Sequence, residues 1–117
     1  MKNNIIKDKS FAFAIRIVQL YKYLKDEKKE FVLSKQLLRS GTSIGAMIRE
    51  AEHAQSRADF THKMSIALKE ANETNYWLEL LYKTEYIETK HYESISSDAA
   101  EVLKMLISIV KTSKTTN

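Results

Sequence analysis

The stretch Leu37–Glu50, LLRSGTSIGAMIRE, decides how this chain of 117 residues folds. It contains the only two glycines of the sequence, Gly41 and Gly45, four residues apart. Leucine and isoleucine recur at helical spacing on both sides, which indicates a helix that is continuous or slightly bent at Gly41–Ser43. A glycine inside a helix costs about 1 kcal/mol relative to alanine, so close packing against another helix has to offset that cost. We therefore predict that this stretch is the inner contact of a helical bundle.

The composition favours long helices joined by short polar connections. The sequence has no proline and only two glycines, whereas loop-rich and β-rich folds use more of both. It has no cysteine, which excludes disulfides, thiolate metal sites and cysteine nucleophiles. No segment approaches the roughly 18 apolar residues that span a bilayer, and residues 11–20 lack the features of a signal peptide. We expect one soluble, cytoplasmic domain over residues 1–117.

Apolar residues recur at alternating spacings of four and three in four successive segments, the pattern of helices that pack side by side. We predict helices at about 10–26, 32–54, 57–84 and 92–112, with residues 112–117 frayed. Ser10 is expected to cap the first helix, and Ser56 with Asp59 to cap the third. Four helical segments predict an all-α fold. Because short connections force antiparallel neighbours, the predicted architecture is a single-domain up-down-up-down four-helix bundle.

The first helix has two apolar stripes instead of one. An isolated bundle buries only one stripe of each helix well, so the second stripe suggests self-association. The two stripes are Phe11, Ala14, Val18 and Tyr21, and Phe13, Ile17, Leu20 and Leu24.

Polar residues in the third helix face small polar residues in the second. Antiparallel pairing about the connection between them places residues whose numbers sum to about 114 side by side. Ser40 then faces Thr74, and Ser40–Ser43 are expected to reach Glu70 and Glu73. Buried polar groups need partners, so we interpret this as a network that fixes helix register or a subunit contact. The predicted packing and register residues are Ser40, Gly41, Ser43, Gly45, Glu70 and Glu73.

Two patterns permit an enzymatic interpretation. Glu50-x-x-His53 and Asp59-x-x-His62 imitate the Glu-x-x-His ligands of di-iron bundles, and Arg57 lies five residues before His62, the R-x4-H spacing of helical ribonucleases of the HEPN type. Both metal-type pairs lie beside a connection and not in the middle of a bundle. We favour surface histidines, predict no cofactor or metal, and keep an enzyme using His53 or His62 as the weaker alternative.

The net charge of +4 favours anionic partners mildly. The lysine run at residues 22–29 shares its end of the bundle with several acidic residues, so its charge is expected to be balanced. The opposite end is the better polyanion surface, with a solvated charged rim as the alternative. The predicted nucleic-acid-binding residues there are Lys7, Lys9, Arg57, Lys63, Lys111 and Lys114.

Four groups of residues together resemble a known bacterial family. They are Phe31-x-Leu33-Ser34-x-Gln36-Leu37-x-Arg39-Ser40-x-Thr42-Ser43-Ile44-Gly45-Ala46, Glu50-Ala51, Ser56-x-x-Asp59-Phe60, and Ala67-x-x-Glu70-Ala71-x-Glu73-Thr74-x-Tyr76-Trp77-Leu78. From about Phe11 to Leu81 the chain is similar to the 23S rRNA intervening-sequence proteins, and the fourth helix is similar in pattern. Met47 stands where that family usually has Asn.

The resemblance implies an up-down bundle that assembles as a ring-like homopentamer. It also implies kinship with the accessory protein of diversity-generating retroelements, a pentameric barrel that binds nucleic acid and a reverse transcriptase. It supplies no enzymatic activity and no catalytic residues. A pentamer would raise the charge to about +20, which favours contacts with phosphates.

We therefore predict a non-enzymatic oligomeric bundle that binds nucleic acid, with RNA and DNA both open, or that scaffolds a nucleic-acid-processing partner. The main alternative is a scaffold that contacts only proteins.

Overall fold

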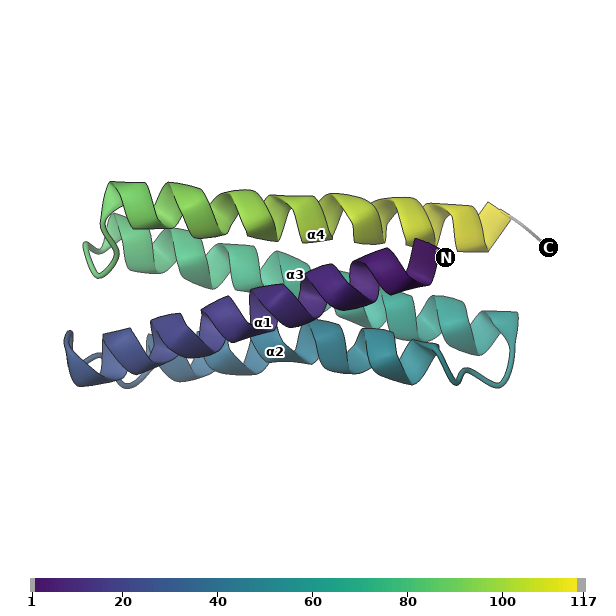
Figure 1. Cartoon of the computed structure of the whole chain (residues 1–117), viewed down its shortest axis with the longest axis horizontal. Helices are drawn as coiled ribbons and strands as arrows, with labels where there is room; N and C mark the ends of the chain where they lie inside the picture. Colours follow the sequence, from purple (N-terminus) through teal and green to yellow (C-terminus); the bar gives the residue numbers. More distant parts are fainter. Residues whose placement is uncertain (1, 116–117) are drawn as a thin grey trace.

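The computed structural model describes residues 2–115 and the side chains of residues 5–115. Its helices are α1 (Lys2–Asp26), α2 (Leu33–Ala51), α3 (Arg57–Lys83) and α4 (Thr89–Thr115), and this part of the chain contains no strand. Successive helices run antiparallel and form a rod of 48 × 20 × 20 Å (Figure 1). The predicted all-α up-down-up-down four-helix bundle is confirmed.

One continuous core fills the rod between the four helices. Each helix turns one stripe inward, and α1 packs mainly on α2, with a smaller contact to α4. Burying one such side chain stabilises the fold by about 1.5–3 kcal/mol. The largest fully buried side chains are Ile6, Phe13, Ile17, Leu20, Leu24, Leu37, Ile44, Ile48, Met64, Leu78, Leu81 and Ile95.

The first helix begins at Lys2, eight residues before the predicted start, and Ser10 is not its cap. Ser10 is buried within α1, and its hydroxyl donates to the backbone carbonyl of Lys7 at 3.0 Å. The reason is Ile6, which is completely buried one turn earlier and continues the core stripe. Burial of Ile6 keeps the first turns of α1 helical. The charged residues from Lys7 to Lys9 hide this continuation of the apolar stripe in the sequence.

The other helix ends differ from expectation by a few residues. The second helix begins one residue later than predicted, at Leu33, and stops at Ala51, three residues early. The fourth extends to Thr89 and Thr115, three residues beyond the predicted range at each end. The expected fraying of residues 112–115 is wrong, because the buried Ser113 hydrogen bonds to Thr61 across the α3–α4 contact. Residues 116–117 lie outside the described part.

Helices α2 and α3 are capped at their N-termini by different hydrogen bonds. At α3 the predicted cap forms: Asp59 N donates to the Ser56 hydroxyl at 3.0 Å, and the Asp59 carboxylate accepts from Gln55 N at 3.1 Å. At α2 the cap is a buried carboxylate, Glu30, which accepts from the backbone amides of Val32, Leu33 and Ser34 at 3.1, 2.9 and 2.7 Å. Burial acts to raise the pKa of Glu30, but these hydrogen bonds outweigh it and lower the pKa below its usual value.

The two glycines of α2 face α1 at different separations. A Cβ atom on Gly41 would lie 2.8 Å from both Cγ1 and Cγ2 of Ile17, closer than side chains pack. A Cβ atom on Gly45 would lie 3.4 Å from the Ser10 hydroxyl, an ordinary contact. Helix α2 passes through both positions without a break. The space beside Gly41 is therefore filled by the branched Ile17 side chain, whereas Gly45 lies against the hydroxyl and backbone of Ser10 with room for a methyl group.

Candidate functional site

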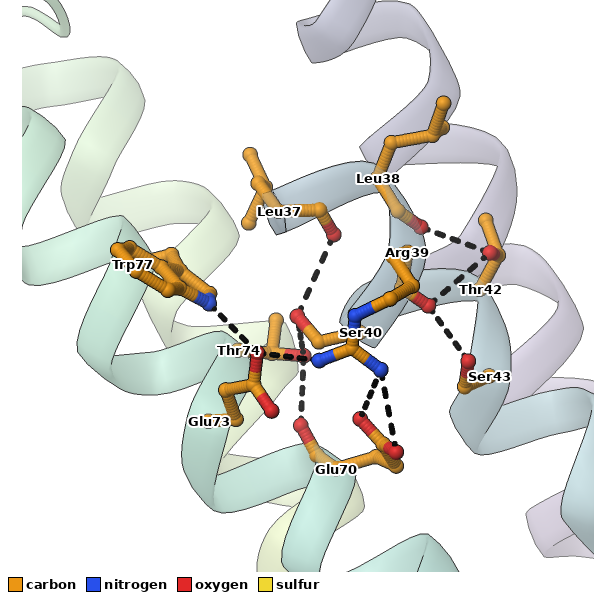
Figure 2. A network of polar contacts seen from close by, with 10 residues as sticks. All are labelled: Leu37, Leu38, Arg39, Ser40, Thr42, Ser43, Glu70, Glu73, Thr74 and Trp77. Atoms are coloured by element: carbon orange, nitrogen blue, oxygen red, sulfur yellow. Dashed lines mark hydrogen bonds and ion pairs between the residues drawn. The ribbon is translucent and has the colours of Figure 1, made fainter. Parts of the chain in front are cut away.

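A polar network joins α2 to α3 midway along the rod (Figure 2). The Arg39 guanidinium binds the Glu70 carboxylate at 3.2 and 3.3 Å and also binds Glu73, which accepts from the Trp77 indole N–H at 2.9 Å. The hydrogen bond from Arg39, followed by that from Trp77, holds the pKa of Glu73 below its usual range. The hydrogen bond to Glu73, followed by the negative charge of Glu70, raises the pKa of Arg39. This cluster fixes the position of one helix against the other.

Beneath the network, two buried hydroxyls set the register. Thr74 Oγ1 lies 2.9 Å from Ser40 Oγ, and both side chains are fully buried, as the antiparallel pairing predicted. The expected contact of Ser43 with Glu70 and Glu73 is wrong. Its short side chain donates to the backbone carbonyl of Arg39 at 2.6 Å, as serines within helices often do. The longer Arg39 side chain reaches the two glutamates instead.

An exposed groove runs between α1 and α2 beside Gly45. Its sides are Phe11 and Arg49, whose guanidinium lies 4.9 Å from the Phe11 ring centroid, and its floor is made of small residues. Phe11 is 51% exposed although it belongs to an apolar stripe of α1. The bundle buries only the other stripe, Phe13 to Leu24, as predicted. The residues lining the groove are Phe11, Ala14, Thr42, Gly45, Ala46 and Arg49.

The two chain ends and the α2–α3 connection gather at one end of the rod, which we call the basic end (Figure 1). Half of the lysine and arginine residues predicted to bind nucleic acid there form ion pairs. The pairs are Lys7–Glu52 at 3.2 Å, Lys9–Glu101 at 3.2 Å, and Lys63 with Asp59 at 3.5 Å and Glu50 at 3.9 Å. The prediction counted too few acids here, because Glu50 and Glu101 lie on helices whose rotation the sequence does not fix, and Glu52 lies just past the end of α2.

The other half of the predicted set is unpaired. Arg57, Lys111 and Lys114 are exposed and have no ion pair with any described residue. Arg57 and Lys114 lie on the rim of a shallow hollow between the start of α3 and the end of α4, together with His62. Its remaining lining residues are Ala58, Thr61, Ser65 and Ser113. No carboxylate is among the described residues that line it.

The far end of the rod, at the α3–α4 connection, has a second hollow of mixed charge. Its lining includes Lys28, Lys83 and Lys90, but also Glu85 and Glu88. This intermixing supports the expectation that charge is balanced at that end.

The histidine motifs do not assemble a metal centre. Because α2 ends at Ala51, His53 lies in the connection and does not share a helix with Glu50. Glu50 and Asp59 both contact Lys63. Within the described residues, no three His, Asp or Glu side chains are grouped so that they could hold an ion.

The sequence paired Arg57 with His62 and placed Lys114 at the same end of the bundle, but the prediction did not bring Lys114 to that pair in one hollow. A signal existed: pairing α3 with α4 about their connection brings together residues whose numbers sum to about 174. Thr61 and Ser113 do so, and they bring Lys114 beside the R-x4-H pair. No comparable pattern in the sequence indicates that Glu30 is buried and caps α2.

None of the described helices is sufficiently long and apolar to cross a membrane. Comparison with curated proteins found no match. Among solved structures, the chain is similar to a protein of unknown function from the S23 ribosomal protein family of Bacteroides thetaiotaomicron VPI-5482. The two share 69% identity and a TM-score of 0.93, over 95% of this chain and 99% of that one.

The model of the 23S rRNA-intervening sequence protein family matches residues 2–108. The match includes most of α4, which resembled the family only in pattern. This chain therefore belongs to the 23S rRNA-intervening sequence protein family.

Proposed function

We propose that this protein is a non-enzymatic, homo-oligomeric bundle that binds nucleic acid through its basic end. The observation that carries the proposal is a set of exposed cations, Arg57, Lys111 and Lys114, that have no ion pair with any described residue, two of which line a hollow with no carboxylate among its described residues. Binding to nucleic acid is favoured when a protein cation replaces the counterions held by a phosphate. A cation already neutralised by a carboxylate adds little to this binding free energy, whereas an unpaired cation adds its full share. The basic end therefore attracts polyanions although half of its predicted binding residues are paired.

Contacts of this kind recognise the phosphate backbone and not the base sequence. One subunit offers few of them, so its own affinity is weak. Several subunits in one assembly multiply the contacts and raise the affinity through a high effective concentration. Self-association is therefore part of the proposed function.

The α1–α2 groove supports self-association. Phe11 and Ile15 are 51% and 46% exposed on α1, and Ile5 is 54% exposed. Of these three, Phe11 lines the groove, and large apolar side chains left exposed on one helix are typical of a surface that another chain covers. The groove lies in the half of the rod that contains the basic end, so assembly there would bring basic ends together.

The binding experiment uses fluorescence anisotropy with single-stranded and duplex RNA and DNA at 50 and 300 mM salt. We expect binding at 50 mM, and about a 100-fold loss at 300 mM if three phosphates are contacted. Absence of binding at 50 mM would overturn the proposal and favour a scaffold that contacts only proteins.

The assembly experiment measures the mass in solution of Ala46→Glu and of a matched control, Ala100→Glu. Both alanines are exposed on helices, and Ala46 lines the groove whereas Ala100 lies on α4. We expect Ala46→Glu to be smaller than the unmodified protein and Ala100→Glu to be unchanged. A monomeric unmodified protein, or disassembly by Ala100→Glu alone, would contradict assembly through the groove.

A further inference from the structure

We propose that the hollow between α3 and α4 binds a phosphate group of the nucleic acid through the side chains of Arg57, His62 and Lys114. This inference rests on the proposed function and assigns it a site. It distinguishes one shallow hollow, where side chains from two helices can contact the same phosphate, from the rest of the charged surface.

The hollow has donors on its rim and hydroxyls on its walls. Arg57 and His62 come from the first two turns of α3, and Lys114 comes from the last turn of α4. The walls include Thr61, Ser65 and Ser113, and the hydrogen bond between Thr61 and Ser113 ties the two helices together there. Guanidinium, ammonium and imidazole groups donate to phosphate oxygens with charge assistance, and hydroxyls can add further donors.

The nearest acid is occupied elsewhere. Asp59 accepts from Gln55 N at 3.1 Å and pairs with Lys63 at 3.5 Å, on the side of α3 that faces α2. The Gln55 amide is the main cause of its lowered pKa, followed by Lys63 and then His62. Asp59 therefore has its main contacts with Gln55 and Lys63 and a weaker interaction with His62, and it forms no ion pair with Arg57 or Lys114.

The site does not depend on the free amides of the helix start. The Ser56 hydroxyl already accepts from Asp59 N, which is one of those amides. The phosphate would be held by side chains from two helices, so its affinity should depend on both α3 and α4. Substitutions on each helix can test this.

Two double variants with the same change of net charge compare this hollow with the far end. Arg57→Gln with Lys114→Gln removes the cations of the proposed site, and Lys83→Gln with Lys90→Gln removes two exposed lysines that line the other hollow. We expect the first variant to bind a nucleic acid about tenfold more weakly at 50 mM salt, with a salt slope lower by about two, and the second to lose about twofold or less. Thermal unfolding should be unchanged in the first variant, because neither side chain has an ion pair in the described part of the chain.

The three histidines provide a second readout within the unmodified protein. His62 lines the hollow, His53 lies in the α2–α3 connection, and His91 lies at the far end with its ring 6.4 Å from that of Tyr23. Titration with inorganic phosphate, followed by NMR of the imidazole resonances, should move His62 to saturation and leave His91 unmoved.

Oligonucleotides with a 5′-phosphate or a 5′-hydroxyl distinguish the source of the phosphate. Tighter binding of the 5′-phosphorylated strand, lost in the Arg57→Gln/Lys114→Gln variant, would assign the hollow to a terminal phosphate. Equal binding of the two strands, with the variant still weakened, would assign it to a backbone phosphodiester. Both results support a phosphate in the hollow.

Equal losses in the two double variants, or a His62 resonance that phosphate does not move, would overturn the inference while nucleic-acid binding itself stands. Absence of nucleic-acid binding by the unmodified protein would overturn both proposals. The two failures are therefore distinguishable.

Discussion

The two ends of the bundle contain similar side chains and differ in which charges line their hollows: carboxylates are present in the far-end hollow and absent from the described lining of the basic-end hollow. At the far end, Lys83 and Lys90 line a hollow together with Glu85 and Glu88. At the basic end, glutamates neutralise lysines of α1 and α3, but Arg57, Lys111 and Lys114 have no ion pair with any described residue. The densest lysine run of the sequence lies at the far end. The proposed preference of polyanions for the basic end therefore rests on which charges lie beside one another in space, and not on lysine density in the sequence.

The ends also use their carboxylates differently. Glu30, in the α1–α2 connection of the far end, is 7% exposed and holds three backbone amides at the start of α2. At the basic end, Glu52 and Glu101 are surface side chains that contact lysines. Acids at the far end include one that stabilises the fold, whereas these two mainly adjust surface charge.

The largest expected effect is on the far-end cap. Glu30→Ala should lower the free energy of unfolding by about 2 kcal/mol, because it leaves the three amides that the carboxylate binds without their acceptor. Urea denaturation measures this. The matched control is Glu27→Ala, an exposed residue of the same connection. If the two variants are equally stable, the cap contributes nothing and the distinction between the ends is wrong.

The second effect tests how tightly α1 packs against the two glycines of α2, of which Gly45 is the nearer to the basic end. Gly41→Ala places a methyl group against the branched side chain of Ile17, and overpacking of about 1–3 kcal/mol outweighs the gain in helix propensity of about 1 kcal/mol. We therefore expect Gly41→Ala to be destabilised. Gly45→Ala meets Ser10 at an ordinary distance, so it should be as stable as the unmodified protein or up to about 1 kcal/mol more stable. Thermal unfolding measures the stability of both variants. A Gly45→Ala variant less stable than Gly41→Ala would contradict this account.

The third effect is the pH dependence of the Glu30 cap. The pKa of Glu30 is lower in the folded protein than its ordinary value of 4.5. A carboxylate with a lowered pKa stabilises the fold above the unfolded value and loses that contribution as pH falls through the folded one. The stability difference between the unmodified protein and Glu30→Gln should be constant from about pH 6 to 8 and should narrow below about pH 4.5. A difference that grows on acidification would contradict this.

The smallest effect is on surface charge at the basic end. Glu101→Gln releases Lys9 from its ion pair, so it should tighten nucleic-acid binding by about three- to fivefold at 50 mM salt. Stability should change little, because exposed ion pairs contribute about 0–1 kcal/mol. The control is Glu93→Gln, which makes the same charge change at an exposed residue in the first turns of α4, at the far end of the rod. Equal tightening in both would mean that only net charge matters.

Sequence reasoning obtained the fold and one internal contact because these depend on spacing alone. Alternating apolar positions determine which face of each helix is buried, and antiparallel pairing about a short connection then brings Ser40 to Thr74. The start of α1 was missed because three charged or polar residues separate Ile6 from Ser10 and hide the continuation of its stripe.

The charge pattern of the basic end could not be derived in the same way. The Lys7–Glu52 and Lys9–Glu101 pairs depend on the rotation of each helix and on long side chains that reach between α1 and its neighbours. The role of Glu30 depends on burial, which the charged sequence around it conceals. Likewise the hollow arises only where α3 and α4 meet, so Arg57, His62 and Lys114 could not be joined from one helix.

The central claim is that nucleic acid binds at the basic end. The most direct test is the chemical reactivity of individual lysines, measured by mass spectrometry with and without nucleic acid at 50 mM salt. We predict that Lys111 and Lys114 become protected while Lys83 and Lys90 stay as reactive as in the free protein. Protection of Lys83 and Lys90, or equal protection at both ends, would contradict the claim.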